Sequence, residues 1–548
     1  MSKLIEKTRS AYEYPLLVKQ LFLAPLANNP EQEIVYRDQL TMTYRTWKER
    51  VCKLANVLTS TGVKPGDTVA VMDWDSHRYL EAYYAIPMMG AVLHTINVRL
   101  PAEQMVYTIE HAEDDVIICH ADFIPLLEAI RGRIISGRKF IIIEDGTEIP
   151  RNHFTFEGEY EKLMEAASPV FDFPEFDENA RATTFYTTGT TGLPKGVYFS
   201  HRQLVLHTIL TTTAITANAS QGRLHTESVY MPLTPMFHVH AWGIPYIATF
   251  LGIKQVYPGK YIPAMLMKLL VSHRVTFSHC VPTILNMLLR DPVAAQFDLS
   301  KWTVVIGGAA LPKSVALEAL KRGIDVFAGY GMSETCPVVS LSMLSESELR
   351  LSPGEQVDLR VRTGRPVGLA QVRVVDADGN DVPWDDKTPG EIIMRTPYLT
   401  QGYHKDHVHS EKLWDGGWMH SNDVACVSSS GNLRITDRTK DVIKVGGEWL
   451  SSLEMEDIIA KMENIAEVAV IGMPDTNWGE IPLAIVVTRD GASFDEKEIL
   501  QYIKMSVDSG VLPREAILMK IRQADAIDKT SVGKVNKVAL RTKFINAT

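Results

Sequence analysis

The sequence predicts an α/β protein with a large N-terminal domain of helix-covered sheets and a small α+β C-terminal domain. Three observations support this fold class. Short buried runs alternate with helical patterns through the first half of the chain. From about Val372 the pattern changes to short strands separated by tight turns, which indicates a β-rich subdomain. The last segment, residues 440–548, has a helix and strand pattern of its own.

The first half contains recognisable single elements. Residues 40–61 read as a short strand and then an amphipathic helix, and residues 68–72 (TVAVM) read as a buried strand. Residues 76–90 read as a helix with Ser76 as its N-cap. Further short strands are predicted at residues 115–118, 140–143 and 304–306. Strands separated by helices favour parallel sheets, because a parallel pair needs a crossover connection.

The second half divides into two parts. Strands beginning at Val372 (VRVVD) and at Gly390 (GEIIMR) alternate with tight turns, and residues 431–438 end this subdomain. A helix at 452–462, strands at 466–471 and 481–487, and a helix at 497–507 follow. We therefore expect an N-terminal domain over residues 1–439 and a C-terminal α+β domain over residues 440–548.

Composition excludes several classes of protein. The 548 residues carry 56 Lys+Arg against 66 Asp+Glu, a net charge of −10, and show no basic run, which argues against a nucleic-acid binder. The longest apolar run contains Pro87 and is too short to cross a bilayer. The N-terminus lacks the apolar stretch of a secretory signal. The five cysteines are far apart without a CxxC pair, which indicates reduced thiols and a cytoplasmic protein.

The most informative motif spans residues 186–197 (YTTGTTGLPKGV). Its hydroxyls, its glycine-rich backbone and one ammonium group are suited to cradle phosphate. The spacing fits neither a Walker A loop nor a Rossmann fingerprint. A plain surface loop is the alternative. The candidate phosphate-binding residues are Thr187, Thr188, Gly189, Thr190, Thr191 and Lys195.

A second motif spans residues 235–242 (PMFHVHAW). If this segment is a strand, His238 and His240 lie on one face of it. A metal site is weakly supported, because no third ligand is apparent nearby. An aromatic-lined core segment is the alternative.

The third motif combines Gly307-Gly308-Ala309-Ala310 with residues 329–335 (GYGMSET). Glycines allow a flat ligand to approach the backbone closely. Tyr330 can stack on adenine, and Glu334 offers the oxygen ligands that Mg²⁺ prefers. In isolation Glu334 would read as a surface carboxylate.

Three further strings follow in the last third of the chain. Residues 417–423 (GWMHSND) include Asp423, whose carboxylate offers two acceptor oxygens. Residues 437–449 (DRTKDVIKVGGEW) include Arg438, Lys440, Lys444 and Trp449. Residues 528–537 (DKTSVGKVNK) include Lys534. By composition alone, these lysines would belong to a solvated charged surface.

Taken in order over nearly the whole chain, these motifs resemble those of the adenylate-forming superfamily, which includes acyl-CoA synthetases, luciferases and peptide-synthetase adenylation domains. The resemblance implies two helix-covered sheets in the large domain and a mobile C-terminal lid. It also implies a reaction that uses ATP, Mg²⁺, a carboxylic acid and CoA. An acyl-adenylate would form first with release of pyrophosphate, and CoA would then take the acyl group with release of AMP.

The resemblance also assigns roles to residues of this sequence. Lys534 would be the catalytic lysine, Thr187 and Glu334 would serve the metal, and His238 would border the carboxylate pocket. Lys440 would be the interdomain hinge. Nucleotide contacts would come from the phosphate loop together with Gly308, Ala309, Gly329, Tyr330, Gly331, Ser333, Asp423, Arg438 and Lys440. Val239, Trp242, Lys444 and Trp449 would serve the acyl group and CoA.

Small departures from the family pattern occur at Ser333, at Ser421-Asn422 and at Asp528. Ser333 keeps the hydroxyl of the commoner threonine. Asn422 replaces glycine but tolerates a positive φ better than most residues, so we expect the local turn to be retained.

The strings PMFHVHAW and KVGGEWLSS look most like those of medium- and long-chain fatty acyl-CoA synthetases. Ligases for short thioether acids such as methylmercaptopropionate share them, and aromatic or alicyclic acids remain alternatives. An adenylating enzyme with an acceptor other than CoA is a further alternative. A non-catalytic binding protein is disfavoured because five site residues are retained together: Thr187, Glu334, Asp423, Arg438 and Lys534. The resemblance makes a homodimer possible.

Overall fold

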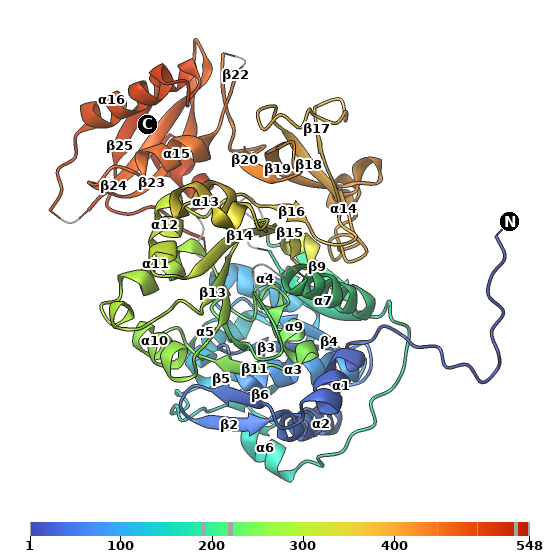
Figure 1. The fold of residues 1–548 in the computed structure, drawn as a ribbon. Helices are drawn as coiled ribbons and strands as arrows, with labels where there is room; N and C mark the ends of the chain where they lie inside the picture. Colours follow the sequence, from blue (N-terminus) through green and yellow to red (C-terminus); the bar gives the residue numbers. More distant parts are fainter. Residues whose placement is uncertain are drawn as a thin grey trace.

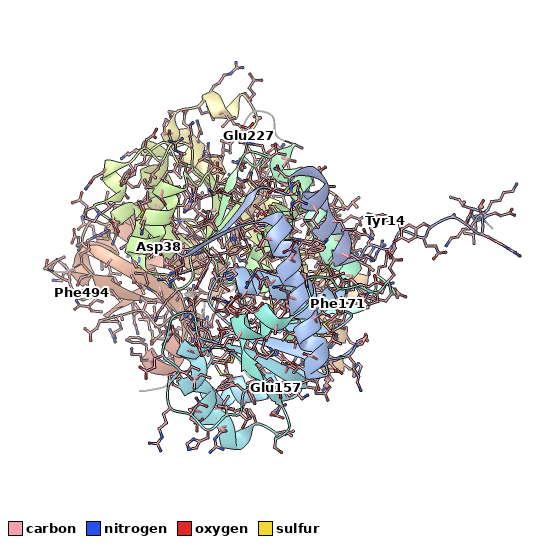
Figure 2. All side chains as sticks on the ribbon, turned by 90° about the horizontal axis from the view of Figure 1, so that it is seen from below. Tyr14, Asp38, Glu157, Phe171, Glu227 and Phe494 are labelled. Atoms are coloured by element: carbon pink, nitrogen blue, oxygen red, sulfur yellow. The ribbon has the colours of Figure 1, made fainter. Side chains whose placement is uncertain are left out.

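The computed structural model describes residues 2–187, 193–217, 223–446, 448–489, 491–530 and 535–545, without the side chains of Glu448 and Trp449. Its described part forms a large body with two smaller units above it, the β17–β20 sheet and the C-terminal unit (Figure 1). The N-terminal segment, which carries Tyr14, projects away from the body (Figure 2). This arrangement confirms the predicted fold class.

The first sheet of the body has seven strands in the order β7-β6-β5-β3-β4-β8-β9. Its pairs are parallel except for the antiparallel pair β8–β9. The strands are β3 (Thr68–Met72), β4 (Val92–Thr95), β5 (Asp114–His120), β6 (Lys139–Ile143), β7 (Gly158–Glu159), β8 (Arg181–Tyr186) and β9 (Gly196–Ser200).

The second sheet has nine strands in the order β16-β15-β14-β13-β12-β10-β11-β1-β2. The six inner strands from β14 to β1 are mutually parallel, and antiparallel strands form both edges. Its strands are β1 (Glu33–Tyr36), β2 (Leu40–Thr43), β10 (Val229–Pro232), β11 (Lys254–Tyr257), β12 (Phe277–Cys280), β13 (Thr303–Ile306), β14 (Asp325–Gly331), β15 (Val338–Leu341) and β16 (Arg365–Pro366).

Helices join and cover the two sheets. One cluster of buried apolar side chains includes residues of both sheets, so the sheets share a core. Helix α3 begins where expected, because the Ser76 side chain accepts the Tyr79 N–H. The helices of this region are α1 (Val18–Asn28), α2 (Tyr44–Thr61), α3 (His77–Met88), α4 (Ala102–Ala112), α5 (Ile124–Ile130), α6 (Tyr160–Ala166), α7 (His201–Thr216), α8 (Val239–Trp242), α9 (Ile244–Leu251), α10 (Pro263–Ser272), α11 (Pro282–Arg290), α12 (Lys313–Lys321) and α13 (Pro353–Arg360).

The predicted β-rich subdomain is an antiparallel four-stranded sheet with its own apolar cluster. It consists of β17 (Gln371–Val375), β18 (Gly390–Arg395), β19 (Met419–Val427) and β20 (Leu433–Arg438), with α14 (His407–Leu413) beside it.

The C-terminal unit has the predicted α+β composition, but its sheet has five strands where two were predicted. The predicted helix at 452–462 ends at Ile459, because the next residues form tighter bonds such as Met462 N–H to the Ile459 carbonyl. The unit consists of β21 (Ile443–Val445), β22 (Glu448–Leu450), α15 (Ser452–Ile459), β23 (Ile465–Asp475), β24 (Gly479–Thr488), α16 (Glu496–Asp508), β25 (Lys520–Gln523) and α17 (Lys537–Phe544). Within the described residues, no helix is long and apolar enough to cross a membrane.

Candidate active site

The candidate site lies where strands of the body end. Thr187 directly follows β8, Gly308 follows β13, and Tyr330 lies near the end of β14. In α/β sheets with parallel strands, ligands bind beyond the carboxyl ends of the strands. The topology therefore brings motifs that are far apart in the sequence to one edge of the body.

The base of the phosphate loop is closed by a backbone hydrogen bond, in which the Thr187 N–H donates to the Lys195 carbonyl at 3.0 Å. The Lys195 ammonium lies 4.5 Å from the centre of the Tyr403 ring, a cation–π contact. Four predicted phosphate-binding residues, Thr188, Gly189, Thr190 and Thr191, lie outside the described residues.

Glu334 is a buried carboxylate with 7 % of its surface exposed, which contradicts its reading as a surface residue. The Tyr403 hydroxyl donates to Glu334 Oε1 at 2.7 Å. Burial and the neighbouring carboxylate raise the pKa of Tyr403, so this hydroxyl stays a donor. Tyr403 thus links Lys195 of the phosphate loop to Glu334, and no sequence motif indicated it.

The donor set fits a magnesium ion held mainly by a nucleotide. Among the described residues, no group of three or more His, Cys, Asp or Glu side chains could hold a metal ion. Mg²⁺ is usually held by one or two carboxylates together with substrate phosphates and water. Glu334 suits that arrangement, because Tyr403 binds its Oε1 and also contacts Lys195 of the phosphate loop.

The nucleotide-contact candidates come together on three strands. The Tyr330 hydroxyl donates to Asp423 Oδ2 at 2.8 Å, and Arg438 Nε lies 3.3 Å from Asp423 Oδ1. Asp423 and Arg438 face each other in the β19–β20 ladder. Asn422 has the positive φ expected at this departure, 57°, but it lies inside β19 at an irregularity of the β18–β19 pairing and not in a turn.

One glycine of the third motif is required by close backbone contact. A Cβ atom added to Gly331 would lie 1.7 Å from the Pro337 carbonyl oxygen, which no side chain can tolerate. Gly308 has a φ of 73° and lines the cavity described below. Ala309 is exposed, and Gly329 and Ser333 are half-buried near the same strand end. These positions leave the backbone open to a flat ligand.

The segment 235–242 is not a strand, which corrects the expectation that His238 and His240 share one face. Val239, His240, Ala241 and Trp242 have φ values of 48°, 54°, 47° and 57°, so α8 is a left-handed turn. Each residue in this conformation costs about 1–2 kcal/mol. Such strain persists only where the surrounding structure enforces it, and it concentrates at functional sites.

The left-handed turn separates the two histidines. His238 lines a cavity together with Trp242, Thr234, Gly308 and Arg99. His240 is fully buried, and neither ring nitrogen has a hydrogen-bond partner in the described part of the chain. Burial lowers the pKa of His240 to about 3, so the ring is neutral. His240 is therefore a core residue, and a shared metal site is not formed.

Three polar residues beside the cavity, Asp75, Arg99 and Tyr261, belong to none of the sequence motifs. Arg99 and Tyr261 line this cavity and also a neighbouring one that Asp75 lines. Asp75 lies in the connection between β3 and α3, and Arg99 lies four residues after β4. The signal that could have found them is their position after predicted buried strands, where ligand-binding residues collect.

The hinge candidate Lys440 lies between β20 and β21, and its carbonyl accepts a hydrogen bond from Arg541 Nη2 at 3.2 Å. Burial, with Arg438 nearby, lowers the pKa of Lys440. Lys444 is exposed on β21. The Trp449 side chain and Lys534 lie outside the described residues.

Tyr330→Phe should weaken ATP binding about tenfold, because the lost hydroxyl orients the Asp423 carboxylate. The measurement is the KM for ATP at saturating acid. Tyr160→Phe is the control, since Tyr160 likewise donates to a carboxylate, Glu81 Oε2 at 2.6 Å, at a buried position away from the candidate site. Equal effects of both substitutions would remove the special role of Tyr330.

Comparison with known proteins identifies the family. The model of the AMP-binding enzyme family matches residues 22–404, and that of the AMP-binding enzyme C-terminal domain matches residues 454–534. The chain belongs to the AMP-binding enzyme family.

Two curated relatives cover nearly all of the chain. A long-chain-fatty-acid–CoA ligase of Thermus thermophilus is 37% identical over 508 residues, 92% of this chain and 90% of the relative. A 3-methylmercaptopropionyl-CoA ligase of Ruegeria lacuscaerulensis is 36% identical over 545 residues, 97% of this chain and 98% of the relative.

Solved structures have the same fold. An anthranilate CoA ligase in complex with anthranoyl-AMP superposes with a TM-score of 0.84 at 22% identity, covering 97% of this chain and 98% of that one. A fatty acyl CoA synthetase of Mycobacterium tuberculosis superposes with a TM-score of 0.71 at 26% identity, covering 97% and 99%. These superpositions confirm the predicted fold, and the family models and curated relatives confirm the family that the sequence motifs indicated.

Proposed function

We propose that this protein is an ATP-dependent acyl-CoA ligase that activates a hydrophobic carboxylic acid, most simply a medium- to long-chain fatty acid. The observation that carries the proposal is that two groups of contacting side chains lie near the strand ends that form the candidate site. Tyr330, Asp423 and Arg438 form the first, and Lys195, Tyr403 and Glu334 form the second. Both are suited to a nucleoside triphosphate.

The chemistry needs two displacements. A carboxylate oxygen of the acid bonds to the α-phosphorus of ATP while the bond to the pyrophosphate oxygen breaks. The thiol sulfur of CoA then bonds to the acyl carbon, the bond to AMP breaks, and the thiol proton is released. The protein contributes mainly positioning and charge neutralisation. Bound Mg²⁺ would neutralise phosphate charge.

Each candidate residue has a role in this scheme. Asp423 would accept the ribose hydroxyls, with Arg438 beside it, and Tyr330 would face the adenine. Glu334 and Thr187 would hold the Mg²⁺, and the phosphate loop with Lys195 would hold the pyrophosphate portion. Lys534 would bridge the acid carboxylate and the α-phosphate.

The acid class rests on the cavity beside His238. Leu233, Val281 and Ile284 give it an apolar lining, and Trp242 lies at one wall. A pocket of this kind discriminates only about 1–3 kcal/mol per methylene, so we expect several chain lengths to be accepted. A short thioether acid such as methylmercaptopropionate is the second candidate, favoured by the relative that is 36% identical over 97% of the chain. Aromatic or alicyclic acids and an acceptor other than CoA are further outcomes of the test.

The test is AMP release by the purified protein with Mg-ATP and an acid series from acetate to palmitate, with benzoate and methylmercaptopropionate, with and without CoA. CoA-dependent AMP release that peaks at one chain length supports the proposal and identifies the acid. Acid-dependent pyrophosphate release without CoA-dependent turnover would keep adenylation and reject CoA as acceptor. The absence of turnover with every acid would reject the proposal.

We propose that residues 440–548 rotate about Lys440 between the two steps, and Lys440→Pro tests this rotation. Proline fixes φ near −65° and restricts the preceding residue. We expect thioester formation from preformed acyl-adenylate to fall much more than adenylation. Single-turnover rates of the two half-reactions measure this, and an equal loss in both would contradict a hinge at Lys440.

We propose a cytoplasmic location for the enzyme. All five cysteines are buried and none is in a disulfide, which suits a reducing compartment. Fractionation of the native host with a cytosolic marker tests this location. A homodimer, which the family resemblance makes possible, is tested by the mass of the full chain in solution.

A further inference from the structure

Three buried side chains bind the backbone that leads into the left-handed turn of α8. The Met236 N–H donates to Asp75 Oδ1 at 2.8 Å, and the Tyr83 hydroxyl donates to the Met236 carbonyl. The Thr95 hydroxyl donates to the Phe237 carbonyl at 2.9 Å. We call Asp75, Tyr83 and Thr95 the clamp.

The clamp joins the two sheets of the body at the candidate site. Its residues lie on β4, on α3 and in the connection between β3 and α3, all associated with the seven-stranded sheet. The clamped segment follows β10 of the nine-stranded sheet. The clamp residues are at most 4 % exposed, so water does not compete for these hydrogen bonds.

The clamp also has its own support. The Tyr261 hydroxyl donates to Asp75 Oδ2 at 2.6 Å, and the Gly259 N–H donates to the Asp75 carbonyl at 2.8 Å. The Tyr83 ring stacks on Tyr246, with ring centres 5.4 Å apart. Asp75 and Tyr83 are therefore each held by contacts other than those with the segment.

The turn after the segment is closely packed on both sides. Trp242 lies against Gly307, where an added Cβ atom would be 3.1 Å from the indole ring, and beside the His279 ring. A Cβ atom added to Gly243 would lie 2.8 Å from His207. His240 packs on Phe185 at 5.2 Å between ring centres.

Positive φ values at four consecutive non-glycine residues need continuous enforcement. Hydrogen bonds within the turn, such as Ala241 N–H to the His238 carbonyl at 3.1 Å, are local and do not fix where the turn points. The clamp fixes the direction of the turn by binding the backbone of the two residues just before His238, Met236 and Phe237.

We propose that Asp75, Tyr83 and Thr95 are positioning residues for the acid-activating reaction. They hold residues 236–237 so that the strained turn presents His238 and Trp242 to the cavity. This inference rests on the proposed ligase function. None of the three side chains needs to touch the substrate for this role.

The first test compares Tyr83→Phe with Tyr79→Phe. Both tyrosines are fully buried on α3, one turn apart, with ring centres 5.5 Å apart. The Tyr79 hydroxyl donates to the Val71 carbonyl at 3.4 Å instead of to the clamped segment. The two substitutions therefore remove the same group from the same helix and differ in the carbonyl that loses its donor.

We expect Tyr83→Phe to lower kcat/KM for the acid by about 10- to 100-fold, the effect of a small misplacement of site groups. The KM for ATP should change by less than about twofold, and Tyr79→Phe should match the wild type. The dependence of rate on acid chain length should also flatten in Tyr83→Phe, because Trp242 is less constrained. A purely structural role would change neither kcat/KM for the acid relative to the KM for ATP nor the dependence of rate on acid chain length.

The second test uses Thr95, whose conservative variant restores the hydroxyl. Thr95→Val removes the donor at nearly constant shape, and Thr95→Ser keeps it. A lower kcat/KM for the acid in Thr95→Val, with a value near wild type in Thr95→Ser, supports the clamp.

The outcomes separate the clamp from the proposed function. Equal kinetics for Tyr83→Phe and Tyr79→Phe, or for Thr95→Val and Thr95→Ser, in an active enzyme would overturn the clamp alone. A wild type without acid-dependent pyrophosphate release would instead reject the proposed function, and with it the reaction that the clamp serves. If Tyr83→Phe fails to fold, the Thr95 pair decides.

Discussion

Replacing Lys534 with alanine is expected to slow acyl-adenylate formation by about 10²–10³-fold, the usual loss when one preorganised donor is removed from a developing charge. The family resemblance places the catalytic lysine directly after the glycine of residues 528–537, and this position lies outside the described residues. The measurement is acid-dependent exchange of pyrophosphate into ATP. Transfer from preformed acyl-adenylate to CoA should be much less affected, because pyrophosphate has then already left.

Lys529→Ala is the control for this substitution, since Lys529 belongs to the same string. Its ammonium lies 2.8 Å from Glu467 Oε1, and both side chains are partly exposed, so this ion pair contributes little. We expect Lys529→Ala to retain the wild-type exchange rate. Similar losses in both variants would indicate a general effect of charge in this segment and would contradict a catalytic role for Lys534.

The elements that could be predicted are those with local signals. The strand at residues 68–72 matches β3 at both ends, and Ser76 caps α3, because burial pattern and capping depend on neighbouring residues. Strand order was not accessible in this way. Ile34 pairs with Gln255, and the sequence between them carries no local sign of that contact. Which strands meet is decided by packing across the whole body.

In the candidate site, too, only the residues that belong to a local sequence motif could be predicted. Tyr330, Asp423 and Arg438 could be named from their strings, and the structure brings them together. Tyr403 could not, because a tyrosine outside any motif reads as an ordinary aromatic residue. The family match confirms the family, while the individual roles of the site residues stay predictions.

The wrong expectation for residues 238–242 has a specific physical cause. Apolar and polar residues alternate there, as in a strand, and the β-branched Val239 favours extended backbone. The left-handed residues instead pack against rings from distant parts of the chain, His240 against Phe185 and Trp242 against His279. The backbone just before them is bound by Asp75 and Thr95. Local preference cannot predict a strained turn whose cause lies elsewhere in the chain.

Glu334→Gln is expected to lower kcat/KM for Mg-ATP by about 10²–10³-fold. The amide oxygen of glutamine can still accept the Tyr403 hydrogen bond, so packing is retained and the negative charge is removed. The effect therefore reports the charge that faces the metal. The measurement is the adenylation rate as a function of free Mg²⁺, and the Mg²⁺ concentration for half-maximal rate should rise.

Tyr403→Phe completes this test because it makes the complementary change, keeping the charge of Glu334 and removing the hydrogen bond that orients it. A hydrogen bond to a charged group contributes about 1.5–3 kcal/mol, but the carboxylate remains able to bind a cation. The loss should therefore be smaller than in Glu334→Gln, with only a slight change in the Mg²⁺ dependence. If Glu334→Gln left the Mg²⁺ dependence unchanged, Glu334 would act through the Tyr403 contact alone. Glu334→Gln would then stay close to the wild-type rate while Tyr403→Phe would be slower, and the metal would have to be held by the nucleotide and other residues.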